Sequence, residues 1–115
     1  MLKAIMTAVA SIALAACASM QVAPERVQAS EQAIQAAQAT GAERQPDAAK
    51  YLELAQSELT QGKKLSDAGE REKAETMLAK GEWDAKLATA KAKEGNSKAE
   101  VQRLADELQK VSANQ

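Results

Sequence analysis

The stretch EREKAETMLAKGEWDAKLATAKAKE, residues 70–94, decides the fold of this chain. Its small and apolar residues recur at intervals of four and three, which places them on one face of an α-helix. At about 1.5 Å per residue this helix is about 37 Å long. Small side chains let neighbouring helices approach toward the short end of the ~8–10 Å range of interaxial distances. The face consists of Ala74, Leu78, Gly81, Ala85, Ala88 and Ala92.

The segments before this helix carry similar faces and predict two shorter helices. The first is expected from about Glu25 to Thr40, ending before Gly41, because glycine adopts the left-handed conformation at little cost. The second is expected to begin at Pro46, which suits a first helical turn, and to have Leu65 near its end. The inward positions are Val27, Ser30, Ile34 and Ala37 in the first helix, and Ala48, Leu52, Ala55, Leu59 and Gly62 in the second.

Two sequence patterns resemble capping boxes, in which a side chain and a Glu three residues later satisfy the first backbone N–H groups of a helix. Asp67 to Glu70 predicts the start of the long helix, and Ser97 to Glu100 predicts a new start after Gly95-Asn96. The alternative is a bent continuation of the long helix. We therefore expect an all-α fold, either an antiparallel helical hairpin or a three- to four-helix bundle with a long third helix. The last segment carries Val101, Leu104, Leu108 and Val111 in a shifted phase.

Four small residues before and within the long helix resemble the small-residue positions of a tetratricopeptide unit. They are spaced by seven, five and seven residues, but Arg71 stands where that motif usually has Tyr. Repeat arrays need at least about three units for stability, and the chain shows one. A helical hairpin with small residues at its crossing is the favoured interpretation. The four residues are Gly62, Gly69, Ala74 and Gly81.

The composition excludes several classes of function. The chain has no His, so it lacks imidazole bases, Ser-His pairs and histidine metal ligands. Its carboxylates interleave with Lys and Arg along solvated helix faces. We therefore expect no catalytic, cofactor-binding or metal residues, no small-molecule substrate, and a protein that is not an enzyme. The formal net charge is −1, and the Lys and Arg residues form no basic stripe along the chain. Nucleic acid is therefore not an expected partner either.

Tyr51 and Trp83, the only aromatic residues, are the remaining candidate site residues. The structural interpretation places Trp83 over the junction between the second and the long helix, where it adds apolar area that alanines lack. The functional interpretation makes it an exposed anchor for a partner protein, because Trp is enriched at interface hot spots. We favour the structural interpretation for both residues.

The N-terminal residues 1–16 predict a cleaved signal peptide. Lys3 supplies a positive region, an apolar segment follows, and small residues precede Cys17. The apolar run falls short of the roughly 20 residues of a membrane-spanning helix. An ordinary secretory leader, with Cys17 incidental, is the alternative. The run Leu14-Ala15-Ala16-Cys17 resembles the lipobox of bacterial lipoproteins, which implies a diacylglycerol on the Cys17 thiol and cleavage directly before it.

Lipidation at Cys17 implies a particular domain order and location. Residues 17–24 become the lipidated N-terminus and tether, and residues 25–115 an Ala-rich helical domain. A single acyl chain binds a membrane only marginally, whereas two or more chains anchor a protein stably. The diacylglycerol and an added palmitate on Cys17 would therefore form a stable anchor. Ala18 and Ser19 follow, where inner-membrane lipoproteins often carry Asp. By resemblance to that sorting pattern, we expect the outer membrane, with the protein facing the periplasm.

The helical part resembles the domain of unknown function 4398 family, which comprises short Ala-rich helical segments of Gram-negative envelope lipoproteins. The resemblance rests on EQAIQAAQATGA at 31–42, the segment 69–74 and DAKLA at 84–88, and it covers about Pro24 to Lys93. Members often precede an OmpA-like peptidoglycan-binding domain, which we expect to be missing here, so cell-wall binding is not implied. The family's own activity is unassigned, so the resemblance implies fold and location.

Together these features predict a membrane-anchored, periplasm-facing lipoprotein with a non-enzymatic structural or protein-interaction role. Its expected partners are the membrane, through Cys17, and an envelope protein or a second copy of itself. One alternative is a self-assembling coiled-coil spacer similar to the major outer-membrane lipoprotein, although Pro46 and the glycines interrupt a continuous heptad. Another is a helical carrier or chaperone for apolar cargo, for which alanine faces leave little cavity volume.

Overall fold

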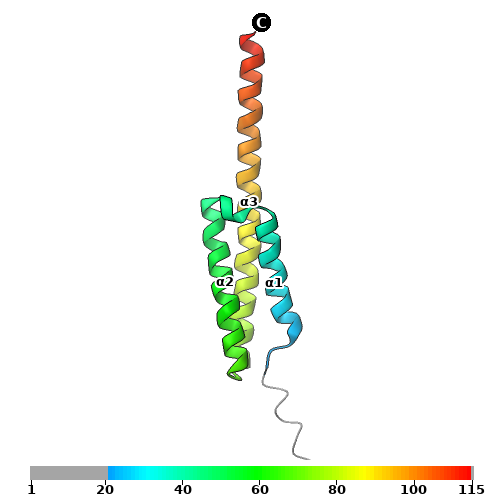
Figure 1. Ribbon diagram of the computed structural model, residues 1–115, viewed down its shortest axis with the longest axis vertical. Coiled ribbons are helices and arrows are strands. Elements are labelled where there is room, and N and C mark those ends of the chain that lie inside the picture. The colour runs from blue at the N-terminus through cyan, green and yellow to red at the C-terminus, as the bar shows by residue number, and fades with distance from the viewer. Residues whose placement is uncertain (1–20, 115) are drawn as a thin grey trace, which may run out of the picture.

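The computed structural model describes residues 21–114, which form three α-helices and a short 3-10 turn (Figure 1). α1 spans Pro24–Ala39, η1 spans Ala42–Arg44, α2 spans Pro46–Asp67 and α3 spans Arg71–Ala113. Successive helices run in opposite directions, and α1, α2 and the first half of α3 lie side by side (Figure 1). The second half of α3 projects beyond this bundle. The predicted all-α bundle with a long third helix is confirmed.

The inner face of α3 forms the centre of the bundle. α3 packs against both other helices and most extensively against α2. Because most inner side chains end at Cβ, the neighbouring helices approach closely over the whole length of the contact. The buried residues of α3 are the six predicted from the spacing: Ala74, Leu78, Gly81, Ala85, Ala88 and Ala92.

The inward faces of α1 and α2 also follow the predicted rows. Val27 and Leu59 are half-buried, and the other predicted positions are buried. Two polar residues of α2, Glu58 and Ser66, are buried as well, which the apolar spacing did not indicate. Apolar periodicity therefore predicted which faces pack but missed the polar groups placed among them.

The residues just before α1 are bound to the base of the bundle. The backbone N–H of Val22 donates a hydrogen bond to Ser66 Oγ at 3.0 Å. The Val22 side chain is buried against Ala74 and Leu78. The described end of the predicted tether is therefore fixed to the end of the bundle from which α3 starts.

The connection between α2 and α3 differs from the predicted capping box. α2 continues through Asp67, and Gly69 adopts a left-handed φ of 78°. The N–H of Glu70 donates to the Leu65 carbonyl at 2.9 Å, and that of Gly69 to the Ser66 carbonyl at 3.0 Å. This is the Schellman arrangement that ends helices at glycine. The capping box was wrong because Gly69 closes α2, and no side chain caps the start of α3.

The predicted break at Gly95-Asn96 is also wrong, because α3 runs through both residues. A Cβ at Gly95 would clash with Gln45 Oε1, so the glycine makes room for the connection between α1 and α2. Asn96 Nδ2 donates to the Thr40 carbonyl at 3.1 Å, and Asn96 Oδ1 accepts from Gln45 Nε2 at 3.4 Å. Both residues therefore serve a tertiary contact. The predicted capping box at Ser97 and the separate fourth helix are therefore wrong. The alternative, in which the long helix continues, is the one that the structure has.

Candidate functional site

Trp83 lies on the outer side of α3, where 68% of its surface is exposed. The prediction that it covers the junction of α2 and α3 is wrong. It follows Gly81 by two residues and so points about 200° away from the inner face, at about 100° per residue. Lys86 Nζ lies 4.6 Å from the centroid of its ring and forms an ion pair with Glu82 Oε1 at 2.6 Å.

Trp83 begins a row of exposed residues that continues to the end of α3, which we call the outer row. The row repeats at alternating intervals of four and three residues, the heptad spacing of a coiled coil. It faces away from α1 and α2, because it lies on the side of α3 roughly opposite the inner face. Its members are Trp83, Leu87, Ala90, Glu94, Ser97, Val101, Leu104, Leu108 and Val111, all exposed.

The projecting half of α3 carries large apolar residues in this row without any partner among the described residues. Val101, Leu104, Leu108 and Val111 keep 66%, 51%, 67% and 59% of their surface exposed. Continuous exposed apolar surface in a small protein marks an interaction site. The outer row is therefore the candidate functional site.

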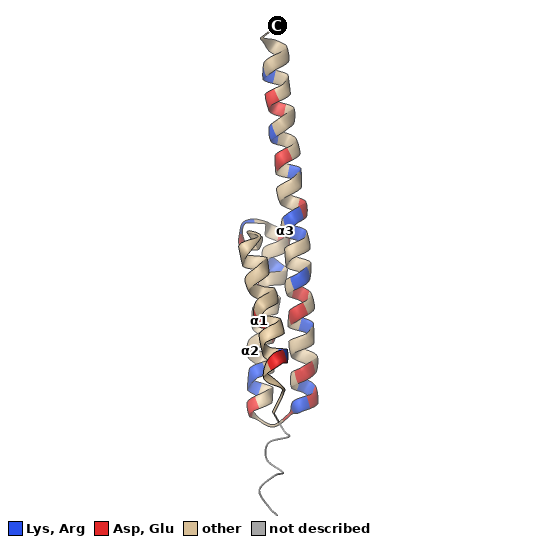
Figure 2. Cartoon of the chain, turned by 90° about the vertical axis from the view of Figure 1, so that its right-hand side faces the viewer, with Lys and Arg blue, Asp and Glu red and all other residues tan. Residues whose placement is uncertain are grey.

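Charged residues of both signs occur along α3, including its projecting half (Figure 2). Arg103 forms ion pairs with Glu100 Oε1 at 2.7 Å and with Glu107 Oε1 at 2.5 Å. The Arg103 guanidinium lowers the pKa of the Glu100 carboxyl below its ordinary value. Two carboxylates thus share one cation, so these three side chains together carry one net negative charge beside the apolar residues of the row.

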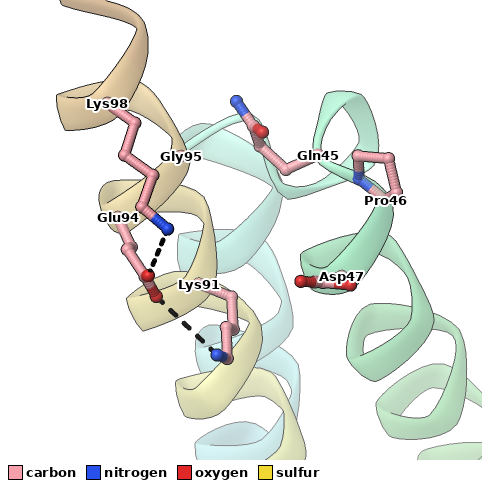
Figure 3. Close-up of a pocket in the computed structure, with 7 residues that line it drawn as sticks. All are labelled: Gln45, Pro46, Asp47, Lys91, Glu94, Gly95 and Lys98. Carbon is pink, nitrogen blue, oxygen red and sulfur yellow. Dashed lines mark hydrogen bonds and ion pairs between the residues drawn. The ribbon is translucent and has the colours of Figure 1, made fainter. Parts of the chain in front are cut away.

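A shallow pocket of about 290 Å³ marks the point where α3 leaves the bundle (Figure 3). Lys91 and Lys98 both pair with Glu94, at 3.7 and 2.7 Å, so their charges are directed to this carboxylate. Lys98 lowers the pKa of Glu94. The volume lies just below the usual range of about 300–1,000 Å³ for ligand sites. The remaining lining residues are Gln45, Pro46, Asp47 and Gly95.

The middle of the bundle contains a buried carboxyl group. Glu58 is 4% exposed, and Lys80 Nζ reaches its Oε1 at 2.7 Å from the surface. Burial raises the pKa of Glu58, the neighbouring Asp84 carboxyl raises it further, and Lys80 opposes the shift. Ser30 Oγ is fully buried nearby and has no hydrogen-bond partner among the described residues. Because the carboxylate oxygens of Glu58 are covered, this group affects stability and does not face a substrate.

Tyr51 occupies a different environment from Trp83. It is half-buried and packs against the main apolar core, as the structural interpretation predicts. Among residues 21–114, no group of three or more His, Cys, Asp or Glu side chains is placed to hold a metal ion. Nor does any helix there have the length and apolarity to cross a bilayer.

The residues predicted for lipid attachment lie outside the described part of the chain. They are Cys17 and the lipobox residues Leu14, Ala15 and Ala16. Lipidation stays a prediction from the sequence.

The outer row could have been found in the sequence from its spacing. Val101 and Leu104 lie at multiples of seven residues from Leu87 and Trp83, so all four residues share one face of a continuous helix. The assumed break at Gly95 separated the two groups and concealed the row. Nothing in the sequence predicted the burial of Glu58. The apolar spacing identifies Leu59 as an inward position, but it does not show whether the neighbouring carboxylate is also buried.

These features define a small helical bundle protein with an extended third helix, whose exposed heptad row suits it to interaction. The chain belongs to the family described as Domain of unknown function (DUF4398), whose model matches residues 24–104. This confirms the resemblance seen in the sequence and extends it into the projecting half of α3. No curated protein and no solved structure matches the chain.

Proposed function

We propose that the chain is a lipid-anchored, periplasm-facing protein of the outer membrane with a non-enzymatic structural or protein-interaction role. The observation that carries the anchor is the lipobox-like run that ends at Cys17, the chain's single cysteine. The observation that supports the interaction role is the exposed apolar outer row of α3. The absence of His from the sequence supports a non-enzymatic role.

The position of Val22 is compatible with such an anchor. Val22 is bound to the base of the bundle, five residues after Cys17. An extended chain spans at most about 3.3–3.6 Å per residue, so the base would lie within about 18 Å of the lipidated thiol. The outer row, on a different surface, would stay free to meet a partner.

Mass spectrometry of the N-terminus of the protein extracted from membranes tests the anchor. We expect a chain that begins at Cys17 and carries a diacylglyceryl thioether and an N-acyl group. Cys17→Ser should abolish this modification and release the chain from the outer-membrane fraction, whereas Ser19→Ala, a matched change beyond the cleavage site, should leave both unchanged. Recovery of the unaltered chain as a soluble species with a free Cys17 thiol would contradict the proposal.

Cross-linking in intact cells tests the interaction role. We expect discrete cross-linked complexes that are lost when Leu104 and Leu108 are replaced by Asp. The same substitution at Leu54, an exposed leucine of α2 that is not part of the outer row, should leave them unchanged. If no complex is recovered from either chain, the interaction role is wrong.

A further inference from the structure

The outer row combines an unpartnered apolar spacing with an ordered arrangement of charge. The residues directly before each first position of the heptad are Lys86, Lys93, Glu100 and Glu107. The two cations border the half of α3 that lies in the bundle, and the two anions border the projecting half. Lys93 has no ion-pair partner among the described residues. On this flank, each half of the row therefore carries the charge that would complement the other half.

We infer that the outer row binds the outer row of a second copy of this chain in antiparallel orientation. In this pairing the projecting half of each α3 lies along the outer side of the other copy's bundle. Trp83 then faces Leu108 of the second copy, and Leu87 faces Leu104. Ala90 faces Val101, and the row's two polar residues, Glu94 and Ser97, face each other at the centre. A two-fold axis repeats every contact, as closed homodimers require.

The flanking charges select this register. In an antiparallel pair, the positions before the first heptad residue lie beside their counterparts on the other helix. Lys86 then lies beside Glu107 of the second copy and Lys93 beside Glu100, and the two-fold axis doubles both pairs. Glu107 and Glu100 share Arg103 within their own helix, so each retains charge for a second cation.

Neighbouring registers bring like charges together. Moving the second copy by one heptad in one direction places Glu100 opposite Glu100, and in the other direction Lys93 opposite Lys93. In each case opposite charges still meet at two sites, as Lys93 with Glu107 or as Lys86 with Glu100, so each shift trades two of the four opposite-charge pairs for a like-charge pair. A parallel, in-register pair places Lys86 beside Lys91 and Lys93 beside Lys98. Like charges at these positions disfavour a coiled coil. Only one of these arrangements joins opposite charges at all four of the sites directly before the first heptad positions.

One flank of the chosen register brings Lys91 near Lys98 of the second copy. Both lysines already pair with Glu94, and the two Glu94 side chains lie at the centre of the assembly. Two carboxylates therefore stand between four ammonium groups there. The bundles do not collide, because α1 and α2 contact the opposite side of α3.

This arrangement has a consequence for the lipid anchor. The two Val22 residues lie at opposite ends of the antiparallel pair. If Cys17 is lipidated as proposed above, both lipids can enter one bilayer when the rod lies along it. The pairing itself uses α3 alone and does not depend on lipidation.

Disulfide cross-linking between two differently tagged full-length chains tests the orientation. One chain carries Leu87→Cys and the other Leu104→Cys, and the pairing places these side chains face to face. We expect a mixed disulfide when both are present, and none from Leu104→Cys alone. Leu54→Cys with Leu104→Cys is the matched control and should give none. Unsubstituted chains measure any background from Cys17.

Three results would overturn the inference. Homodimers of Leu104→Cys alone indicate parallel pairing, an adduct of another mass indicates a different protein on the row, and the absence of any cross-link indicates no pairing. Repeating the experiment with Cys17→Ser separates this inference from the proposed function. The mixed disulfide should persist in that chain even if the anchor proposal fails.

Charge reversal tests the register independently. Lys86→Glu with Lys93→Glu places like charges at all four sites, and we expect dimer dissociation to rise about tenfold in sedimentation equilibrium, about 1.4 kcal/mol. Adding Glu100→Lys and Glu107→Lys should restore most of this loss. Lys50→Glu with Lys110→Glu changes the net charge equally away from the flanks and should have little effect. A quadruple variant that dimerises no better than the double variant would overturn the register.

Discussion

The two faces of α3 differ in a way that burial within one chain does not explain. The inner face packs with alanines and a glycine, and Leu78 is its only large residue. The outer row holds Trp83, two Val and three Leu residues, all exposed. Full burial of a Leu side chain contributes roughly 1.5–3 kcal/mol, so the larger apolar residues lie where the monomer gains least from them. The inner face is built for close approach of helices, and the outer face is suited to a second partner.

The largest expected effect comes from truncating the same residue type on each face. Leu78→Ala should lower the free energy of unfolding by about 2–5 kcal/mol, because Leu78 is 1% exposed and its loss leaves a cavity. Leu104→Ala should cost less than about 1 kcal/mol in dilute solution, because Leu104 is half exposed. Urea unfolding followed by circular dichroism measures both.

Protein concentration sharpens this comparison. The deficit of Leu78→Ala should persist at every concentration, since its contacts lie within one chain. The deficit of Leu104→Ala should grow with concentration if the outer row pairs with a second copy, because binding stabilises the folded state by mass action. Equal deficits for the two variants in dilute solution would contradict the assignment of the two faces.

The bundle could be predicted from the sequence because its signal is periodic. The 4-3 spacing from Ala74 to Ala92 identified the inner face of α3 without error, and Pro46 and Gly41 marked the first helix connection. The local sequence signals for helix starts and ends were less reliable. Gly95 was predicted to end α3, but it makes room for Gln45 within the helix. Asp67 was predicted to begin α3, but it ends α2 ahead of a Schellman turn at Gly69.

The candidate site was predicted only in part for the same physical reason. Trp83 was identified as open to a partner, but the favoured interpretation placed it in the bundle. A one-dimensional pattern shows which residues share a face, and it does not show which of two apolar faces the neighbouring helices choose. α1 and α2 pack against the alanine face because small side chains allow closer contact along its whole length.

Two helical glycines give a second, smaller contrast. Gly→Ala within a helix gains about 1 kcal/mol in propensity wherever the added Cβ fits. At Gly62 that Cβ would lie 2.7 Å from Leu78, which is packed in the core, so Gly62→Ala should destabilise the chain by about 1–3 kcal/mol. At Gly95 it would meet only the end of the Gln45 side chain, which can move, so Gly95→Ala should be neutral or stabilising. Thermal and urea unfolding measure the difference.

The Gly95 variant also tests the exit of α3 from the bundle. If Gln45 moves aside, Asn96 still binds the Thr40 carbonyl, and the fold persists. Asn96→Ala in the same background separates the two contacts. A Gly95→Ala chain that loses more stability than Gly62→Ala would show that the junction is less adaptable than the core.

The smallest effect concerns the buried carboxyl group of Glu58, compared with exposed Glu53 on the same helix. Because the pKa of Glu58 is raised above its ordinary 4.5 in the folded chain, the folded state retains a proton that the unfolded state has lost. The free energy of unfolding therefore decreases as the pH rises from about 4.5 through the raised value. Asp84 raises this pKa and Lys80 lowers it, and both face the Glu58 carboxyl.

Glu58→Gln should remove this contribution to the pH dependence, because the amide stays neutral. Relative to the unchanged chain, its stability should improve as the pH rises, by about 1 kcal/mol, the usual net cost of an imperfectly hydrogen-bonded buried group. Asp84→Asn should weaken the same slope, and Glu53→Gln should leave it intact. Urea unfolding from pH 4 to pH 8 measures all three. If the pH dependence of stability were the same for Glu58→Gln and the unchanged chain, the carboxyl group would not be held in the folded interior. The helix contact around Gly81 would then be looser than its buried alanine neighbours indicate.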